Sequence, residues 1–405
     1  MLKISNKRFK NLIFGLVLFL ALTVLVSDVV AQEKLPGAWG PYLTLKDEST
    51  VAINWRAEDG PEVVHYDRAS YFLKNNHLRE KATDRQEGEV FHHVSLTDLR
   101  PGTKYVYRIG HSTGQFSLNY FETPESEPEE FTFFVYGDTR TCPGRHRLVA
   151  SEMALDPLNP AFIVHTGDLV ESPVSPNWAN FFWAIEPFSG STPLVPVLGN
   201  HEKNDDSYYE SFVLPSGGGD YEKQWYSFEY GKVNFIVLDS NSNLIGLNDF
   251  LKEKAWLEKE LENQTRPFTV VMFHHPMFSS EYSAGKDSGL ESSWGTLFEK
   301  YGVELVFNGH VHSYERLEKN GVTYVVTGGG GAPTGQLNSR FEFSKKARGD
   351  SLHYVRVTVK NEEMKLQTVE VAKLNRSGGG ARVGCNVEMD VSRRLIDEIL
   401  IEKLD

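Results

Sequence analysis

The stretch AFIVHTGDLVES, residues 161–172, decides how the fold of this chain is interpreted. Its first half is a short apolar run, and the pair Gly167-Asp168 follows directly. An apolar run of this length that ends in turn residues is typical of a buried strand, so Asp168 is expected at the carboxyl end of that strand. A carboxylate placed there needs a partner. Glu171, three residues later, raises the question of whether it assists Asp168.

The same pattern of an apolar run followed by a polar turn recurs from residue 131 onward. The runs are FTFFVYGD, AFIVHTGD, TPLVPVLGNHE, VNFIVLDS, FTVVMFHHP, VELVFNGHVH and VTYVVTGGGG. They alternate with helical stretches, which is the pattern of a layered α/β fold. In open α/β sheets the binding crevice lies outside the carboxyl ends of the strands, so the polar residues that end these runs are expected to converge.

Five of these runs end in side chains that bind metal ions in proteins. They are Asp138, Asp168, Asn200, His274, and the pair His310 and His312. Each signal is weak alone, because a Gly-Asp pair after a strand is most often a simple turn. Oxygen donors mixed with imidazoles suit zinc, manganese or iron, and six donors exceed what one tetrahedral ion requires. The sequence therefore predicts a site for two metal ions.

Taken in order, the motifs GD, GD, GNHE, HxP and GHxH resemble those of the calcineurin-like metallophosphoesterases, over residues 131 to about 371. GNHE and GHVHSYER resemble the purple acid phosphatases in particular. The resemblance implies that Asp168 bridges two divalent or trivalent ions, with iron, manganese and zinc all open. It places Asp138 and His312 on one ion, and Asn200, His274 and His310 on the other. Such a pair activates water as hydroxide and clamps phosphoryl oxygens.

Three further residues are expected to face the substrate. His201 follows a predicted ligand and would bind the phosphate or protonate the leaving oxygen, with support of the site as the alternative. Arg140 is expected to donate hydrogen bonds to a phosphate oxygen, and the alternative is that it forms an ordinary surface salt bridge. His275, between His274 and Pro276, is either a substrate-binding residue or a residue that faces a neighbouring strand.

Residue 171 departs from the resemblance. Purple acid phosphatases have a bridging-aspartate motif GDxxY, whose tyrosine is a metal ligand and gives the colour, whereas this chain has Glu171. Three roles stay open for Glu171: a metal ligand, an acceptor for a metal-bound water, or a solvated loop residue. A second departure lies at FSSEYSAGKD, residues 278–287, where plant-type enzymes have two more histidines. Protonation of the leaving group then falls to His201, His275 or water.

The part before residue 124 alternates short apolar runs with turns, which indicates an antiparallel β-sandwich. LTDLRPGTKYVYRIG, residues 96–110, resembles a fibronectin type III module, a domain that purple acid phosphatases often carry in front of the catalytic one. The predicted fold is an α/β layered metallophosphoesterase sandwich preceded by an all-β fibronectin type III-like domain. The predicted boundaries are 1–31 for a signal peptide, 32–125, 126–372, and 373–405 for a C-terminal extension.

The first 31 residues have the pattern of a secretory signal peptide. Four basic residues precede an apolar stretch at 12–26, and small residues follow at 29–31. A membrane anchor is the alternative, but the stretch is shorter than the ~20 apolar residues of a spanning helix. The protein is therefore expected to be secreted, periplasmic or at the cell surface, with no membrane span after cleavage. The net charge of −13 makes a nucleic-acid polymer an unexpected partner, whereas a local cationic site still attracts a small phosphorylated substrate.

Other stretches carry smaller expectations. Cys142 and Cys385 are the only cysteines, and both a disulfide and two free thiols are open. GGGG at 328–331 is expected to be a mobile loop near the site, with a phosphate cradle of backbone amides as the alternative, because no Gly-Lys-Ser/Thr follows it. NWANFFWAIEP is expected to be a core-facing helix, and LKEKAWLEKELENQ an amphipathic surface helix. RRLIDEILIEK near the end is either a strand or a short helix.

These observations favour a secreted binuclear metal-dependent phosphatase that hydrolyses phosphomonoesters by metal-hydroxide attack. The alternative is a phosphodiesterase or nucleotidase with the same metal site, a choice that the loops at 279–296 and 328–340 decide. An inactive exported binding protein is a third reading, and the six filled ligand positions argue against it. Neither the natural substrate nor the oligomeric state follows from the sequence.

Overall fold

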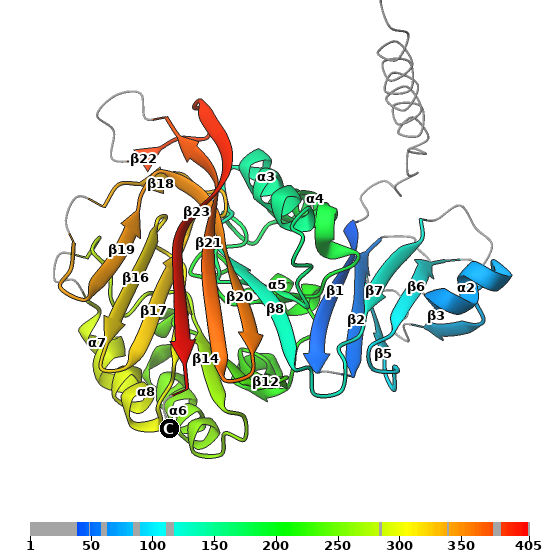
Figure 1. The fold of residues 1–405 in the computed structure, drawn as a ribbon, viewed down its shortest axis with the longest axis horizontal. Helices are drawn as coiled ribbons and strands as arrows, with labels where there is room; N and C mark the ends of the chain where they lie inside the picture. Colours follow the sequence, from blue (N-terminus) through cyan, green and yellow to red (C-terminus); the bar gives the residue numbers. More distant parts are fainter. Residues whose placement is uncertain are drawn as a thin grey trace, which may run out of the picture.

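The computed structural model describes residues 39–47, 49–57, 63–83, 90–110, 117–282, 286–337, 340–375 and 382–403. The predicted signal peptide lies outside these residues. Two large sheets form the body of the molecule, and a smaller sheet lies at its side (Figure 1). Among the described residues, no helix combines the length and apolar character that crossing a membrane requires.

The larger sheet has nine strands in the order β23-β21-β20-β8-β9-β10-β1-β2-β5. Its parallel centre consists of β8 (Glu130–Tyr136), β9 (Ile163–His165) and β10 (Leu194–Pro196). On one side, antiparallel pairing adds β20 (Ser351–Lys360), β21 (Glu363–Leu374) and β23 (Met389–Glu402). The stretch RRLIDEILIEK is therefore a strand and belongs to the edge strand β23.

The second sheet has eight strands in the order β11-β12-β13-β14-β15-β17-β16-β19. The strands are β11 (Gly217–Gly218), β12 (Trp225–Tyr230), β13 (Val233–Val237), β14 (Phe268–Met272), β15 (Leu305–Asn308), β16 (Tyr314–Lys319), β17 (Val322–Thr327) and β19 (Ser344–Arg348). The neighbours β13, β14, β15 and β17 run parallel to one another. A separate pair joins β18 (Thr334–Gly335) to β22 (Arg382–Val383).

The parallel strands are apolar along their whole length because both of their faces are covered. In β14, Val270 and Met272 belong to the core that lies between the two sheets, whereas Val271 belongs to a second core beneath helices. Phe133 of β8 meets Phe235 of β13 with ring centroids 5.2 Å apart. The two sheets thus pack face to face, and the predicted layered α/β class is confirmed.

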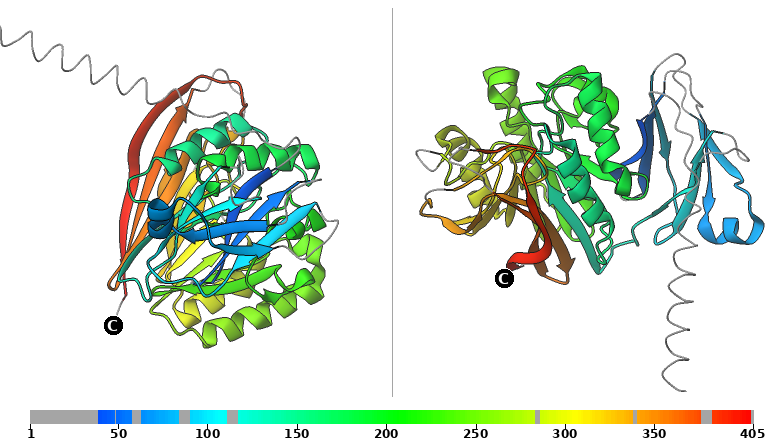
Figure 2. Two further views of the ribbon diagram at one scale, coloured as in Figure 1. Left: turned by 90° about the vertical axis from the view of Figure 1, so that its right-hand side faces the viewer. Right: turned by 90° about the horizontal axis from the view of Figure 1, so that it is seen from above.

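Helices cover the outer faces of the two sheets (Figure 2). The longer ones are α3 (Pro143–Ala154), α4 (Ser175–Ser189) and α6 (Ser242–Glu262), and the shorter ones are α5 (Asp206–Ser211), α7 (Ser288–Leu290), α8 (Thr296–Tyr301), the 3₁₀ turn Asp220–Glu222 and the π turn Glu291–Gly295. In α4, Trp178, Phe181, Phe182 and Ile185 are all buried, as the spacing predicted. In α6, Leu257 and Leu261 are buried while Leu251 faces solvent.

The N-terminal part is a β-sandwich around its own apolar core. Its first layer has β1 (Trp39–Asp47), β2 (Thr50–Arg56) and β5 (Phe91–Leu96), and its second has β4 (Glu80–Thr83), β3 (Val63–Arg68), β6 (Lys104–Ile109) and β7 (Asn119–Glu122), with the short helix α2 (Ala69–Asn75). β1 also pairs in parallel with β10, with Thr44 opposite Leu194. The larger sheet therefore runs without a break from the N-terminal sandwich into the α/β part.

Two expectations about irregular segments are settled by packing. Cys142, at the start of α3, forms a disulfide with Cys385, with their Cα atoms 5.5 Å apart. The expectation of a mobile GGGG loop is wrong, because all four glycines are buried. Gly330 donates to the carbonyl of Gly137 at 2.8 Å, and a Cβ on Gly330 would lie 2.4 Å from that oxygen. The glycines allow close backbone approach behind the site.

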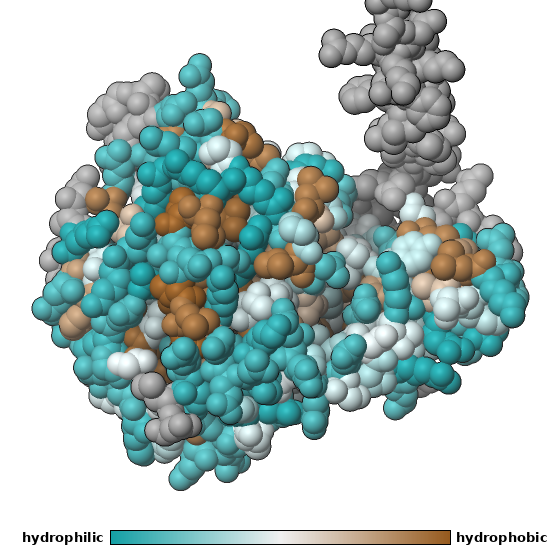
Figure 3. Space-filling view, in the orientation of Figure 1, coloured by the Kyte–Doolittle hydropathy of each residue, from teal (hydrophilic) through white to brown (hydrophobic). Residues whose placement is uncertain are grey.

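The face of the molecule seen in Figure 1 is mostly hydrophilic, and its hydrophobic patches are small and separate (Figure 3). Some of them lie over the region of β21 and β23. The exposed apolar residues of β23 include Val391, Leu395 and Leu400. Scattered apolar residues of this kind are common on protein surfaces and need no special explanation.

Candidate metal centre

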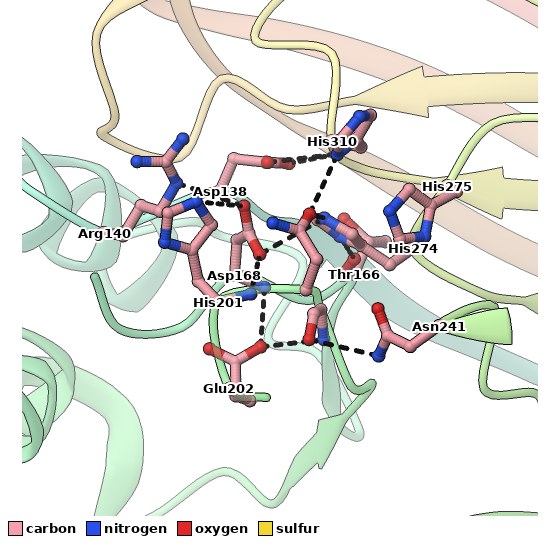
Figure 4. A network of polar contacts seen from close by, with 12 residues as sticks. Asp138, Arg140, Thr166, Asp168, His201, Glu202, Asn241, His274, His275 and His310 are labelled. Atoms are coloured by element: carbon pink, nitrogen blue, oxygen red, sulfur yellow. Dashed lines mark hydrogen bonds and ion pairs between the residues drawn. The ribbon is translucent and has the colours of Figure 1, made fainter. Parts of the chain in front are cut away.

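The six predicted ligands converge where the parallel strands of the two sheets end. Figure 4 shows Asp138, Asp168, His274 and His310 close together. Three follow strands of the larger sheet, namely Asp138 after β8, Asp168 after β9 and Asn200 after β10. The other three follow strands of the second sheet, namely His274 after β14 and both His310 and His312 after β15. The site thus draws on both sheets. The position of the motifs after the strands predicted that these residues converge, but not that they come from two sheets.

The turns that carry these residues have an unusual backbone. Asp138 and Asp168 both have φ of +57°, and His310 has φ of +66°. Non-glycine residues in this left-handed region cost about 1–3 kcal/mol each and persist only where the surroundings hold them. The backbone N–H of His310 donates to both carboxylate oxygens of Asp138, at 3.0 and 2.9 Å. Backbone strain and hydrogen bonding together fix the direction of the carboxylates.

The donor atoms form two groups that meet at Asp168. In one group, Asn200 Oδ1 lies 3.1 Å from His274 Nε2 and 3.0 Å from His310 Nδ1, and His274 Nε2 lies 3.2 Å from Asp168 Oδ1. In the other, ligand atoms of Asp138, Asp168 and His312 all lie within 4.8 Å of one another. This is the arrangement in which Asp168 would bridge two ions.

Neighbouring carbonyls fix the imidazoles for metal binding. His274 Nδ1 donates to the carbonyl of Thr166 at 2.9 Å, and His312 Nδ1 donates to the carbonyl of Pro333 at 2.7 Å. A carbonyl can only accept, so the proton of the neutral ring lies on Nδ1 and leaves Nε2 with a free lone pair. Such second contacts orient metal-binding histidines and fix their tautomer. In both residues Nε2 is the atom that faces the carboxylates.

We call the buried residues Asp138, Asp168, His274 and His312 the floor of the site, since none is more than 2% exposed. Burial alone lowers the pKa of His274, but the carboxylate of Asp168 outweighs burial and raises that pKa to about 9. At His310, burial and the neighbouring His274 lower the pKa to about 2. The raised pKa of His274 means that the buried carboxylate of Asp168 stabilises positive charge at the floor. A metal ion would replace the extra proton of His274, since histidine ligands must be neutral.

A buried carboxylate that the sequence analysis did not single out connects two of the ligand turns. Glu202, which is 0% exposed, accepts hydrogen bonds from the backbone N–H groups of Gly199, Asp168 and Val170, at 2.7, 3.0 and 3.1 Å. Asn241 binds the other side of the same turn, because its Nδ2 donates to the Gly199 carbonyl at 3.2 Å (Figure 4). The GNHE motif contains Glu202, but a motif does not reveal which groups its carboxylate holds.

Three side chains form what we call the rim of the site, namely Arg140, Glu171 and His201, which are 13%, 47% and 24% exposed. Arg140 Nε donates to Asp168 Oδ2 at 3.1 Å, and its Nη1 donates to Glu171 Oε2 at 2.8 Å. His201 Nδ1 donates to the Glu171 carbonyl at 2.7 Å, which leaves His201 Nε2 4.0 Å from Asp168 Oδ2. Figure 4 shows Arg140 and His201 beside Asp168.

The carboxylate of Glu171 is held by two neighbours. It accepts a hydrogen bond from Arg140 Nη1 and another from the Thr141 hydroxyl. Although partial burial raises its pKa, the hydrogen bonds from Thr141 and Arg140 outweigh burial and lower the pKa of Glu171 overall. With Arg140, Glu171 also lines a cavity of about 190 Å³ between α3 and α4.

His275 lies closer to the metal donors than its predicted role in substrate binding suggests. One of its ring nitrogens groups with those of His274 and His310, all within 4.8 Å. His275 Nδ1 also forms a hydrogen bond of 2.9 Å with the hydroxyl of Ser240. Contact with substrate therefore stays a prediction for His275, and for Arg140 and His201 as well.

Comparison with protein families agrees with this geometry. Residues 131–314 match the calcineurin-like phosphoesterase family, and residues 39–132 match the purple acid phosphatase N-terminal domain. The chain thus consists largely of a calcineurin-like phosphoesterase domain preceded by a purple acid phosphatase N-terminal domain. Both parts of the predicted recognition are confirmed at this level.

Several similar proteins are named as purple acid phosphatases. Purple acid phosphatase 15 of Arabidopsis thaliana is 27% identical over 291 residues, which cover 60% of this chain and 54% of that protein. Fe(3+)-Zn(2+) purple acid phosphatase 12 of the same plant is 30% identical over 263 residues, covering 59% and 55%. The chain thus spans about half the length of these relatives.

A solved structure shares the fold. The purple acid phosphatase PPD1 from seeds of yellow lupin (Lupinus luteus) superimposes with a TM-score of 0.69 at 19% identity, covering 82% of this chain and 72% of the lupin chain. At this identity the likeness establishes the fold. It supports the arrangement of an all-β domain in front of a metallophosphoesterase domain.

Proposed function

We propose that this protein is an exported phosphatase that uses two metal ions to hydrolyse phosphomonoesters. The observation that supports this most is the convergence of six donor residues into two groups that share Asp168. Carboxylate, amide and imidazole donors with free lone pairs fit ions such as iron, manganese or zinc. One relative is named as an Fe(3+)-Zn(2+) enzyme, which makes that pair a reasonable first choice to test.

We propose that Asp138 and His312 hold one ion, that Asn200, His274 and His310 hold the other, and that Asp168 bridges them. Bound there, two ions supply an activated water and neutralise charge on the phosphoryl group. The residues of the chain would do the rest. Arg140 would bind a phosphoryl oxygen, and His201, oriented by the carbonyl of Glu171, would give a proton to the leaving oxygen from Nε2.

We also propose domain boundaries close to residues 32–125, 126–372 and 373–405. The last boundary is the least separate in space, since β23 pairs along the length of β21. Export is supported by the basic and apolar N-terminal segment in the sequence and by the disulfide Cys142–Cys385, because disulfides persist mainly in oxidising compartments.

The test combines metal analysis with a substrate screen. The purified protein is analysed for bound metals, stripped with a chelator, and reloaded with iron, manganese or zinc. Phosphate release is then measured from monoesters, diesters and nucleotides. We expect two ions per chain and activity on monoesters that the chelator abolishes and metal restores. Higher activity on diesters or nucleotides would favour the phosphodiesterase or nucleotidase alternative. Two bound ions without any hydrolysis would favour the third hypothesis, in which the protein is an inactive binding protein.

A further inference from the structure

Glu171 contacts both of the rim side chains that are proposed to face the substrate. Its carboxylate accepts from Arg140 Nη1 at 2.8 Å, while its backbone carbonyl accepts from His201 Nδ1 at 2.7 Å. Replacement of the side chain at 171 therefore removes the contact with Arg140 but leaves the carbonyl that orients His201. Mutation of the side chain thus removes the hydrogen bond to Arg140 and keeps the hydrogen bond to His201, although Glu171 Oε1 also lies 4.0 Å from His201 Nδ1.

The guanidinium of Arg140 is fixed by carboxylates on two of its three nitrogens. Nε donates to Asp168 Oδ2 at 3.1 Å, and Nη1 donates to Glu171. Among the described residues, none accepts a hydrogen bond from Nη2. Because a guanidinium is planar, two anchored nitrogens determine where the third one points. Arg140 thus holds a positioned donor, with no acceptor in the described part of the chain, next to the predicted bridging carboxylate.

Charge explains why Arg140 needs Glu171. The floor contains two carboxylates, and its imidazole ligands are neutral when they bind metal, so a pair of divalent ions leaves the centre with net positive charge. A guanidinium beside such a centre is repelled by it. The carboxylate of Glu171, on the side of Arg140 away from Asp168, supplies the attraction that keeps the guanidinium in place. Its lowered pKa, caused by Thr141 and Arg140 against partial burial, agrees with a charged partner.

We propose that Glu171 is a positioning residue that holds Arg140 against the third non-bridging oxygen of a phosphomonoester, so that the pair selects monoesters over diesters. This inference rests on the proposed phosphatase function and specifies its substrate class. A monoester has three non-bridging oxygens and nearly two negative charges at neutral pH, since its second pKa is about 6. A diester has only two such oxygens and one charge. A third cationic donor therefore stabilises the monoester more.

The test compares Glu171→Gln, Arg140→Gln and the double variant with the unmutated, metal-loaded protein. The values of kcat/KM are measured for para-nitrophenyl phosphate and bis(para-nitrophenyl) phosphate, above the second pKa of the monoester. We expect the ratio of monoester to diester kcat/KM to fall about 10-fold in Glu171→Gln and further in Arg140→Gln, as loss of charge-assisted hydrogen bonds implies. The effect of Glu171→Gln should appear mainly in KM, and metal content should stay at two ions per chain.

The double variant shows whether Glu171 acts through Arg140. We expect it to match Arg140→Gln alone, because Glu171 has nothing left to position, and we expect Glu171→Asp to recover part of the ratio. The matched control is the ion pair Arg147–Glu186 on α3 and α4, whose atoms lie 3.3 Å apart at the surface. Neutralising either residue of that pair should leave the ratio unchanged.

Two results would overturn the inference. One is an equal fall of monoester and diester kcat/KM in Glu171→Gln. The other is a double variant whose loss is the product of the single losses. If the unmutated protein hydrolyses neither ester, the proposed function fails, and binding of inorganic phosphate to the metal-loaded protein, measured by calorimetry, then decides the inference. Weaker binding in Glu171→Gln supports positioning by Glu171, and unchanged binding contradicts it.

Discussion

The floor and the rim of the site are held in place by different means. Floor residues are no more than 2% exposed, and their directions are set by backbone strain and by hydrogen bonds to main-chain groups. Rim side chains are 13–47% exposed and depend mainly on one another, through contacts centred on Glu171. The main-chain carbonyls that orient His274 and His312 remain when a neighbouring side chain is replaced, whereas the rim contact between Arg140 and Glu171 is lost with one substitution. The floor therefore suits a function common to a family, and the rim suits the choice of substrate.

The largest effect is expected from breaking the floor at its shared carboxylate. Asp168→Ala should remove both metal ions, because Asp168 contacts both donor groups, whereas Asn200→Ala should loosen only one ion. Elemental analysis of the purified variants measures this directly. Asp168→Asn, which keeps the shape of the side chain, and circular dichroism control for folding. Full loading of both sites in Asp168→Ala would contradict the bridging assignment.

Removal of the rim imidazole should affect turnover but not metal content. His201→Ala is expected to keep two ions and to lose turnover by about 10²-fold or more, the usual contribution of a positioned proton donor. The loss should grow with the pKa of the leaving alcohol, because a poor leaving group needs the proton most. Rates on a series of substituted phenyl phosphates test this. Equal turnover on a poor leaving group would rule out the acid role.

Replacement of Glu202 tests how the turns that carry Asp168 and Asn200 are held in place. Glu202→Gln should lower metal affinity by about 10–100-fold, since the amide no longer satisfies three backbone donors that orient the turns of Asp168 and Asn200. It should also lower Tm, because a buried donor left unpaired costs about 1–3 kcal/mol. Metal titration against a competing chelator measures the first effect. A lower Tm with unchanged metal affinity would mean that Glu202 only supports the fold.

Much of the set of six candidate ligands could be predicted from sequence because its signals are local. An apolar run followed by Gly-Asp, Gly-Asn or Gly-His indicates both a strand and what stands at its end, and strand ends in such sheets meet at one edge. Metal binding by these residues, and the roles of His201, Arg140 and His275, stay predictions. The packing of the two sheets follows from apolar runs long enough to be covered on both faces.

The parts that sequence did not predict depend on contacts distant along the chain. Pairing of β1 with β10 joins residues 44 and 194, and no local periodicity encodes it. The GGGG segment looked like a free loop, because glycine serves both mobile turns and close backbone contacts. Glu202 belongs to a visible motif, yet its three backbone donors come from turns that meet only in the folded chain.

The smallest expected effect is spectroscopic and concerns residue 171. Loaded with iron, the unmutated protein should lack the intense visible band of a phenolate-to-ferric transition, because Glu171 stands where the purple acid phosphatase motif has tyrosine, and a carboxylate gives no such band. Its carboxylate lies with Arg140 and Thr141 at the rim. Absorption spectra of the iron-loaded protein and of Glu171→Tyr compare the two side chains under the same conditions.

The outcome of Glu171→Tyr then shows which way position 171 can turn. A coloured variant would mean that a side chain at 171 can reach the metal carried by Asp138 and His312, so that the rim has taken over a ligand position. A colourless variant would mean that this position faces Arg140 only. A strong band already present without mutation would point to another tyrosine, and Tyr314 is the first to test because it lies two residues after His312 of the GHVH motif. In that case residue 171 would not explain the colour at all.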